Sequence, residues 1–195
     1  DGDAIPEVVF ASTASTGGGL TEPGFLRALS GAGGGEVFTV TDPNLAVASS
    51  CSVAVGDIDG DRRPEIIACA ASGVGLIAFE HDGTFKWRRD GLESNYWGGA
   101  AIADIDEDGT PEIVMGRQVL AADGTLRFTA SVPTRGSQGS FGPLSLVADV
   151  DVDGLPEIVA GSSVASGTGA QELRFPIADG YPAVGNFDGD PQAEV

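Results

Sequence analysis

The 195-residue chain carries a net charge of −19, from 29 acidic and 10 basic residues, and 42% of its residues are hydrophobic. That composition is typical of a globular protein and not of a disordered one. No run of 18 apolar residues exists, which excludes a membrane-spanning helix in this segment, and no basic patch is present to bind nucleic acid. Most of the acidic residues gather in a few short loops, where like charges would repel one another without a cation among them.

These loops are copies of one motif. Complete copies begin at Asp57, Asp104 and Asp149, a fourth copy begins at Asn186, and residues 1–10 correspond to a copy without its first position. Counted from the first carboxylate, each complete copy has side-chain oxygens at positions 1, 3, 5 and 9 and then runs into apolar residues. Successive starts lie 47, 45 and 37 residues apart (57 to 104, 104 to 149, 149 to 186), which indicates a repeat of about 40–50 residues.

Each repeat is predicted to contain short strands and tight turns. After residues 1–10, the segment 11–24 is predicted to be an inserted surface loop, and 25–40 resumes with a strand, a glycine turn and a strand. The next units each show four runs joined by turns, with Asp82-Gly83 and Asp123-Gly124 at hairpin positions. These runs cover 51–59, 64–71, 75–83 and 84–90 in one unit, and 100–106, 111–116, 117–123 and 125–131 in the next.

The predicted fold is therefore all-β, a propeller-like array of four-stranded antiparallel blades with about four blades present. The whole chain, 1–195, is expected to be one propeller segment. Its approximate repeats are 1–48, 49–95, 96–140, 141–180 and 181–195, with the first and last partial.

The acidic motif has the chemistry of a calcium loop. Oxygens on alternate residues of a tight turn converge on one point, and Ca²⁺ takes six to eight oxygen ligands, whereas zinc prefers nitrogen or sulfur and Mg²⁺ keeps several waters. An EF-hand is excluded because position 12 lacks glutamate and the flanks are strands. We expect several structural Ca²⁺ ions, with the backbone carbonyl as ligand at position 7. The candidate ligands are Asp57, Asp59, Asp61, Arg63 and Glu65; Asp104, Asp106, Asp108, Thr110 and Glu112; Asp149, Asp151, Asp153, Leu155 and Glu157; Asn186, Asp188, Asp190, Gln192 and Glu194; and Asp1, Asp3, Ile5 and Glu7.

The two cysteines, Cys51 and Cys69, flank one acidic loop on what the pattern predicts to be two strands of a hairpin. A cross-strand disulfide fits that placement, and so do two buried thiols.

The loop pattern resembles a known family. The sequence DxDxDGxPE, an apolar strand and a small-residue turn at Met115 or Ala160, with Phe141-Gly142 ahead of Asp149, is similar to the FG-GAP repeats of integrin α-subunit propellers. It is closer to the FG-GAP/VCBS-type repeats of bacterial secreted proteins, and Tyr96-Trp97-Gly98 stands at the Phe-Gly place of another copy. The resemblance implies a propeller with calcium in its hairpin loops, and a chain that is a fragment of a longer secreted or surface protein.

Three functions compete at this stage. The first is an extracellular or cell-surface structural and adhesion module that binds a protein or glycan partner and forms homo-oligomers or fibres through exposed strand edges. The second is a lectin, with Tyr96 and Trp97 as stacking faces, while Trp87 is expected to pack between blades. The third is a polysaccharide lyase, which is disfavoured because the one histidine, His81, is expected at an exposed turn and the one lysine, Lys86, lies on a strand. We expect no enzymatic activity.

Overall fold

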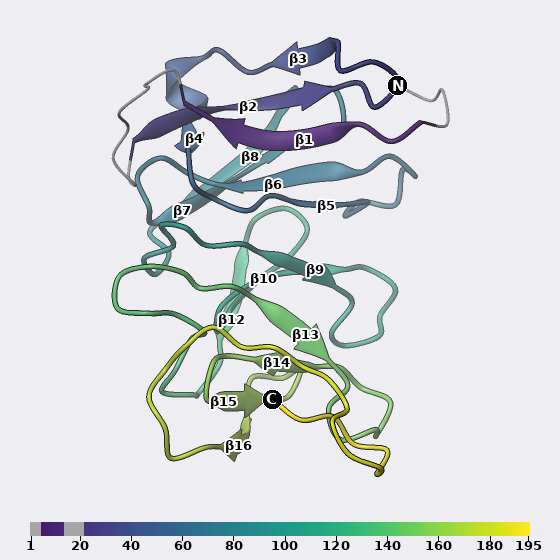
Figure 1. Ribbon diagram of the computed structural model, residues 1–195, viewed down its shortest axis with the longest axis vertical. Coiled ribbons are helices and arrows are strands. Elements are labelled where there is room, and N and C mark those ends of the chain that lie inside the picture. Colours follow the sequence, from purple (N-terminus) through teal and green to yellow (C-terminus); the bar gives the residue numbers. More distant parts are fainter. Residues whose placement is uncertain (1–4, 14–21) are drawn as a thin grey trace.

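The computed structural model describes residues 5–13 and 22–195, and in them the chain forms four antiparallel sheets. The sheets follow one another in chain order along the long axis of the molecule (Figure 1). The first contains β1 (Val8–Ser12), β2 (Pro23–Leu29), β3 (Glu36–Thr39) and β4 (Val47–Ala48). The second contains β5 (Ala54–Gly56), β6 (Glu65–Cys69), β7 (Gly75–Phe79) and β8 (Phe85–Asp90). The third contains β9 (Ala101–Ala103), β10 (Glu112–Met115), β11 (Gln118–Leu120) and β12 (Leu126–Thr129). The fourth contains β13 (Leu146–Ala148), β14 (Glu157–Val159), β15 (Ser163–Ala165) and β16 (Gln171–Arg174).

The last three sheets are simple meanders, because each strand pairs with the next one along the chain. In the first sheet β4 pairs with β2 instead. The four-stranded antiparallel units predicted from the sequence are thus confirmed. The predicted loop at 11–24 was too long at both ends, because β1 continues to Ser12 and β2 begins at Pro23; residues 14–21 lie outside the described part of the chain.

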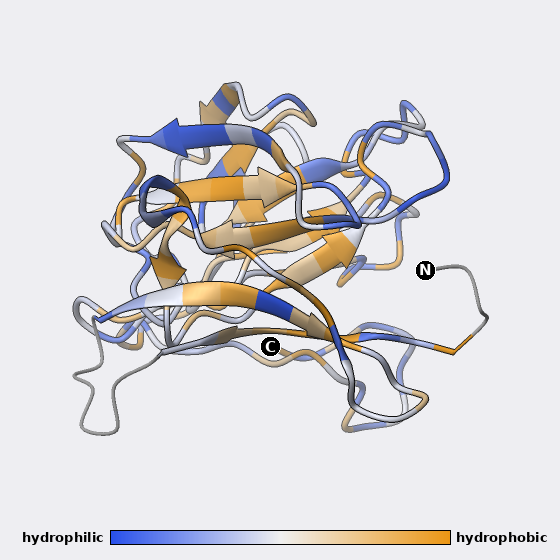
Figure 2. Cartoon of the chain, turned by 90° about the horizontal axis from the view of Figure 1, so that it is seen from above, coloured by the Kyte–Doolittle hydropathy of each residue, from blue (hydrophilic) through white to orange (hydrophobic). Residues whose placement is uncertain are grey.

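The core lies between the sheets and not inside any one of them. In β6, Ile66 and Ala68 pack with residues of the first sheet, whereas Ile67 and Cys69 pack with residues of the third. A strand covered on both faces has no polar side to alternate with, and every residue of β6 and β7 is accordingly buried. In the last three sheets the fourth strands, β8, β12 and β16, are half exposed or fully exposed instead, and Figure 2 shows that the inner strands consist mostly of hydrophobic residues.

One contact recurs between neighbouring sheets. An aromatic side chain from an outer strand lies on the glycine of the hairpin turn in the next sheet: Phe38 on Gly83, Trp87 on Gly124 and Phe128 on Gly169. Trp87 also donates a hydrogen bond from Nε1 to the carbonyl of Ala122, at 2.8 Å. The expectation that Trp87 packs between blades is therefore confirmed.

The first strands of neighbouring sheets lie side by side. The segments that lead into β5, β9 and β13 form parallel bridges, Ser52 with Gly99 and Gly99 with Leu144. Hydrogen bonds fix this arrangement, including Ser52 N to the Gly98 carbonyl at 2.9 Å. Short backbone links of this kind set the position of each sheet relative to the next.

The cysteines carry free thiols in the structure. The prediction that both lie on strands was wrong for Cys51, because β5 begins only at Ala54, while Cys69 ends β6. The hydrogen bond that Cys69 donates to Cys51, and then burial, raise the pKa of Cys69, whose Sγ also lies 3.6 Å from the Gly98 carbonyl. Among the described residues, no helix is long and apolar enough to cross a membrane, and Pro43–Leu45 forms a single 3-10 turn.

The contact between Trp87 and Gly124 predicts a large effect of one added methyl group. Gly124 has a φ of +82°, and a Cβ there would lie 2.7 Å from the Trp87 ring. We expect Gly124→Ala to lower the free energy of unfolding by about 2–4 kcal/mol, from backbone strain together with overpacking. Urea unfolding of the two proteins measures this difference.

Gly91→Ala is the matched control, because Gly91 has a φ of +77° but open space around its missing Cβ. It should cost about 1–2 kcal/mol, the strain alone. Equal losses for the two variants would show that the aromatic contact does not hold the sheets together.

Candidate metal centres

The three complete acidic motifs occupy the same place in three sheets. Each forms the loop between the first and second strands: Asp57–Glu65 joins β5 to β6, Asp104–Glu112 joins β9 to β10, and Asp149–Glu157 joins β13 to β14. We call these loops 1, 2 and 3. Their equivalent positions follow from antiparallel pairing, which puts the last residue of the first strand opposite the glutamate that opens the second, as Gly56 opposite Glu65 in loop 1.

The carboxylate at position 1 organises the turn. In loop 1, Asp57 accepts hydrogen bonds from the backbone N–H groups of Gly60 and Arg62, at 2.7 and 2.9 Å. Asp104 and Asp149 do the same in loops 2 and 3, where the donors are the N–H groups at positions 5 and 6. The aspartate at position 5 in turn accepts from the N–H at position 7 in all three loops.

The glutamate at position 9 is the last residue of each loop, and its side chain accepts the backbone N–H at position 2. Glu65 Oε2 accepts the N–H of Ile58 at 2.9 Å, and Glu112 and Glu157 accept the N–H of Ile105 and Val150 at 3.2 and 2.8 Å. These three side chains are almost completely buried, with at most 2% of their surface exposed. Burial raises the pKa of each, and the backbone hydrogen bond only partly opposes that effect.

The backbone of the three loops is the same despite different glycine positions. Positions 4 and 6 are left-handed in every loop: Gly60 and Arg62, Glu107 and Gly109, Val152 and Gly154. In each loop glycine takes one of these positions and an ordinary residue is forced into the other. The loops differ in the donors to the first aspartate, which are the N–H groups at positions 4 and 6 in loop 1 and at positions 5 and 6 in loops 2 and 3.

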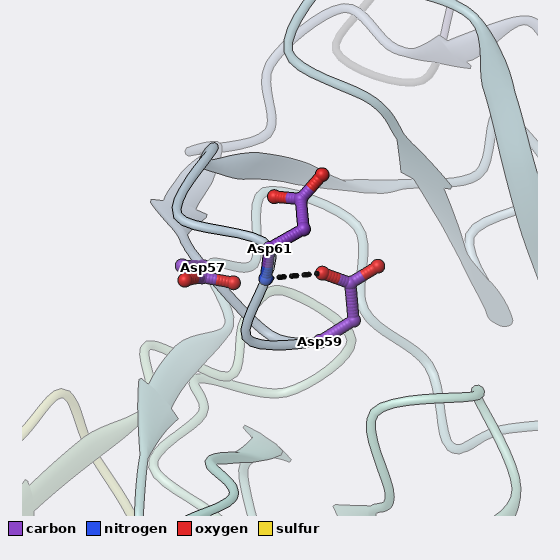
Figure 3. A group of neighbouring side chains, drawn as sticks. All are labelled: Asp57, Asp59 and Asp61. Carbon is purple, nitrogen blue, oxygen red and sulfur yellow. Dashed lines mark hydrogen bonds between the residues drawn. The ribbon is translucent and has the colours of Figure 1, made fainter.

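Oxygen atoms converge in each loop to within 4.8 Å of one another. The converging groups are Asp57, Asp59 and Asp61 in loop 1 (Figure 3), Asp104, Asp106 and Asp108 in loop 2, and Asp149, Asp151 and Glu157 in loop 3. An all-oxygen set suits a hard cation such as Ca²⁺. In loop 1 the Oε1 atom of Glu65 is buried without a hydrogen-bond partner among the described residues. The residues present therefore fit a divalent cation.

Basic side chains from the outer strands reach two of the loops. Lys86 Nζ lies 2.7 Å from Asp59 Oδ2 and 3.6 Å from Glu65 Oε1. Arg127 contacts Asp106 Oδ2 at 2.8 Å and also pairs with Glu112. Nothing in the motif itself pointed to these two residues, because they lie 21 or more residues after the loop's third position.

The other copies are less complete. In the fourth copy, Asp188, Asp190 and Glu194 converge, and Glu194 Oε2 accepts the N–H of Phe187 at 2.7 Å, as its counterparts do. Asn186 instead donates its amide N–H to the carbonyl of Asp190. In the first copy Asp1 and Asp3 lie outside the described residues, while Ile5 is exposed and Glu7 half-buried.

The two aromatic residues predicted as a sugar platform lie at a contact between sheets. Tyr96 packs against Gly73, where a Cβ would come within 2.2 Å of its ring, and its carbonyl accepts the N–H of Gly142 at 2.7 Å. Trp97 stands beside Phe141, with ring centroids 5.1 Å apart. Sugar binding by this pair stays a prediction.

The raised pKa values of the buried glutamates predict a pH dependence without metal. A carboxyl group whose pKa is raised in the folded state stabilises the protein below its unfolded pKa, near 4.3, and this contribution is lost as the pH rises through the folded pKa. In chelator, the melting temperature should therefore fall as the pH rises from about 4.3 toward neutrality. Glu157→Gln keeps an oxygen acceptor for Val150 N–H and should flatten this fall, as thermal melts at each pH would show. A melting temperature that rises over this range in both proteins would contradict the assignment.

Comparisons with known proteins agree with this architecture. Residues 57–115 match the family model described as FG-GAP-like repeat. The crystal structure of the Vibrio cholerae biofilm matrix protein Bap1 superposes with a TM-score of 0.79 at 24% identity, over 99% of this chain and 32% of that one. The exotype rhamnogalacturonan lyase YesX superposes with a TM-score of 0.55 at 20% identity, over 76% of this chain and 29% of that one.

No curated protein matches the chain by sequence. The chain spans about a third of the length of the solved structures that it resembles, and at such identities the likeness establishes the fold alone. The match to the family model covers loop 1, loop 2 and the strands between them, whereas Phe141-Gly142 and loop 3, which also carried the sequence resemblance, lie outside it. Residues 57–115 therefore match an FG-GAP-like repeat, the family that the sequence resembles.

Proposed function

We propose that this chain is part of a calcium-stabilised β-propeller that acts outside the cell as a structural and adhesive module. The observation that carries the proposal is the threefold repetition of one loop geometry. Each loop gathers at least three carboxylate groups at the same corner of a sheet, and each holds them with the same backbone hydrogen bonds.

The propeller arrangement is supported by how the sheets meet. Successive four-stranded meanders pack face to face, and their first strands lie next to one another with parallel bridges between the segments that lead into them. In a propeller the first strands line the axis and the fourth strands form the rim. The exposure of β16, against the burial of β14 and β15, fits that placement.

Calcium is the ion that the donor set favours. Each loop has carboxylates at positions 1, 3, 5 and 9, and with the backbone carbonyl at position 7 they make five ligand groups. One bidentate carboxylate or a water would then complete a coordination sphere of six or more oxygens. When bound, the ion would neutralise charges that now repel one another. Because the unfolded chain lacks such a site, its binding free energy would stabilise the fold.

An extracellular place suits this design. Calcium sites of extracellular modules are often weak enough to fill only at about 0.1–1 mM, a concentration that is maintained outside cells. Bap1, which shares the fold over nearly all of this chain, is a biofilm matrix protein. A role in a matrix or at a cell surface, with a protein or glycan partner, is the function that this likeness supports.

The two residues whose side chains could act as a base in a lyase, His81 and Lys86, have structural contacts instead. The one histidine, His81, lies 3.1 Å from an Arg63 guanidinium nitrogen. Lys86 donates hydrogen bonds to Asp59 and Glu80. Burial lowers the pKa of Lys86, but these hydrogen bonds raise it by more, so Lys86 stays protonated and is a poor general base at neutral pH. The resemblance to YesX rests on the fold and carries no catalytic group to this chain.

Calcium titration of chelator-treated protein tests the proposal. We expect calorimetry to detect Ca²⁺ binding, and thermal melts to show a rise of about 5–10 °C for each site at a hundredfold excess over its Kd. Asp149→Asn should remove part of the bound calcium and part of the rise. Mg²⁺ at the same concentration should have a smaller effect.

Asp123→Asn is the control, because Asp123 accepts only the Thr125 N–H in a hairpin turn outside the loops. It removes the same charge and should leave calcium binding unchanged. If the wild-type protein binds no calcium at millimolar concentration, the proposal is wrong.

A further inference from the structure

The three loops differ in the charge of one neighbouring residue, which lies on the fourth strand and is not part of the loop motif. In each of the three sheets that carry loops 1 to 3, the pairing of the third and fourth strands has a register shift. At this shift one residue of the fourth strand has no partner in the third strand. This residue is Lys86 in β8, Arg127 in β12 and Glu172 in β16. We call it the bulge residue. The same place in the fold is thus basic beside loops 1 and 2 and acidic beside loop 3.

The basic bulge residues neutralise the same two loop positions. Lys86 lies at 2.7 Å from the carboxylate at position 3 of loop 1 and at 3.6 Å from the glutamate at position 9. Arg127 pairs with positions 3 and 9 of loop 2, Asp106 and Glu112. These charges are held close to a buried carboxylate, so they are screened less than ordinary surface pairs.

Loop 3 has the opposite arrangement. Glu172 occupies in β16 the same bulge position from which Lys86 and Arg127 reach the carboxylates of loops 1 and 2, so an acidic group stands beside loop 3 where a basic one stands beside the other two. In loop 3 the converging set includes the glutamate at position 9, Glu157, whereas in loops 1 and 2 it does not. Among the described residues no lysine or arginine forms an ion pair with Glu157, whose carboxylate converges with those of Asp149 and Asp151.

We propose that the charge of the bulge residue decides which cation each loop holds: Lys86 and Arg127 are built-in counter-ions of loops 1 and 2, and loop 3, which has the acidic Glu172 beside it, is the tightest divalent-cation site of the three. This inference rests on the proposed calcium function and adds a ranking to it. Reversing one unit charge about 5 Å from a divalent ion changes its affinity on the order of a hundredfold, even at the dielectric constant of water. Loops 1 and 2 then bind calcium only where the ion displaces the side chain that neutralises them.

The experiment titrates the whole chain with Ca²⁺ in a calorimeter, with no other ligand. The wild-type protein should show one site at least about tenfold tighter than the others, and Asp149→Asn should abolish it. Glu172→Arg should weaken this site by about tenfold or more, and Arg127→Gln should tighten a second site, which Asp104→Asn should then remove.

The variants are chosen to keep the fold intact. Glu172 lies on β16, whose four residues are all exposed, so its replacement leaves the core untouched. Arg127→Gln removes the charge beside the buried Glu112 but keeps an amide N–H as donor, and its melting temperature in chelator shows whether the fold survives. Leu173→Arg is the control, because it places the same arginine on an exposed neighbour on β16, adding one positive charge there, and it should leave the tight site in place.

The outcomes separate this inference from the function on which it rests. Equal affinities at all three loops, unmoved by Glu172→Arg, would overturn the ranking while leaving calcium binding established. An equal effect of Leu173→Arg and Glu172→Arg would also overturn it, since the position of the charge would then not matter. No binding in the wild type or in Arg127→Gln would instead reject the proposed function itself.

Discussion

The structure depends on a buried carboxylate at the base of each acidic loop. The glutamate at position 9 accepts the backbone N–H at position 2 and lies beneath the loop with almost no exposed surface. A buried carboxylate is costly unless hydrogen bonds or a cation compensate it. The hydrogen bond fixes where the first strand ends and the second begins. The second carboxylate oxygen of the glutamate is stabilised only if a positive charge lies beside it. In the second, third and fourth sheets, the loop between the first and second strands therefore needs a positive charge beside its buried glutamate.

The chain meets that requirement in different ways in different sheets. In the second and third sheets a basic side chain from the outer strand reaches back to the buried glutamate. In the fourth sheet the equivalent residue is itself acidic. A repeat protein can thus keep one backbone geometry while varying the charge that balances it. Repeats of this kind need not bind metal equally, even when their loop sequences are almost the same.

The sheets depend on each other through contacts that the loops do not provide. Aromatic residues of one outer strand rest on the hairpin glycine of the next sheet, and the inner segments are bridged by backbone hydrogen bonds. The central strands are buried on both faces, so a sheet needs its neighbours to cover its apolar residues. The acidic loops lie at the corners of this stack, where charge can gather without entering the core.

The sequence by itself determined the strands, the turns and the loops. Alternating oxygen donors, the proline and glutamate that follow them, and the Asp-Gly turns are local signals, and the structure places β6, β7, β10 and β11 where those signals predicted strands. Local signals could not place Lys86 or Arg127 beside a loop 21 or more residues away, because a register shift in the outer strand brings them there. Nor could they set the common backbone of loops whose glycines differ, since pairing between strands holds Arg62 and Val152 in the left-handed region. The charge around each site is decided by neighbours across the sheet, and only the tertiary structure brings those neighbours together.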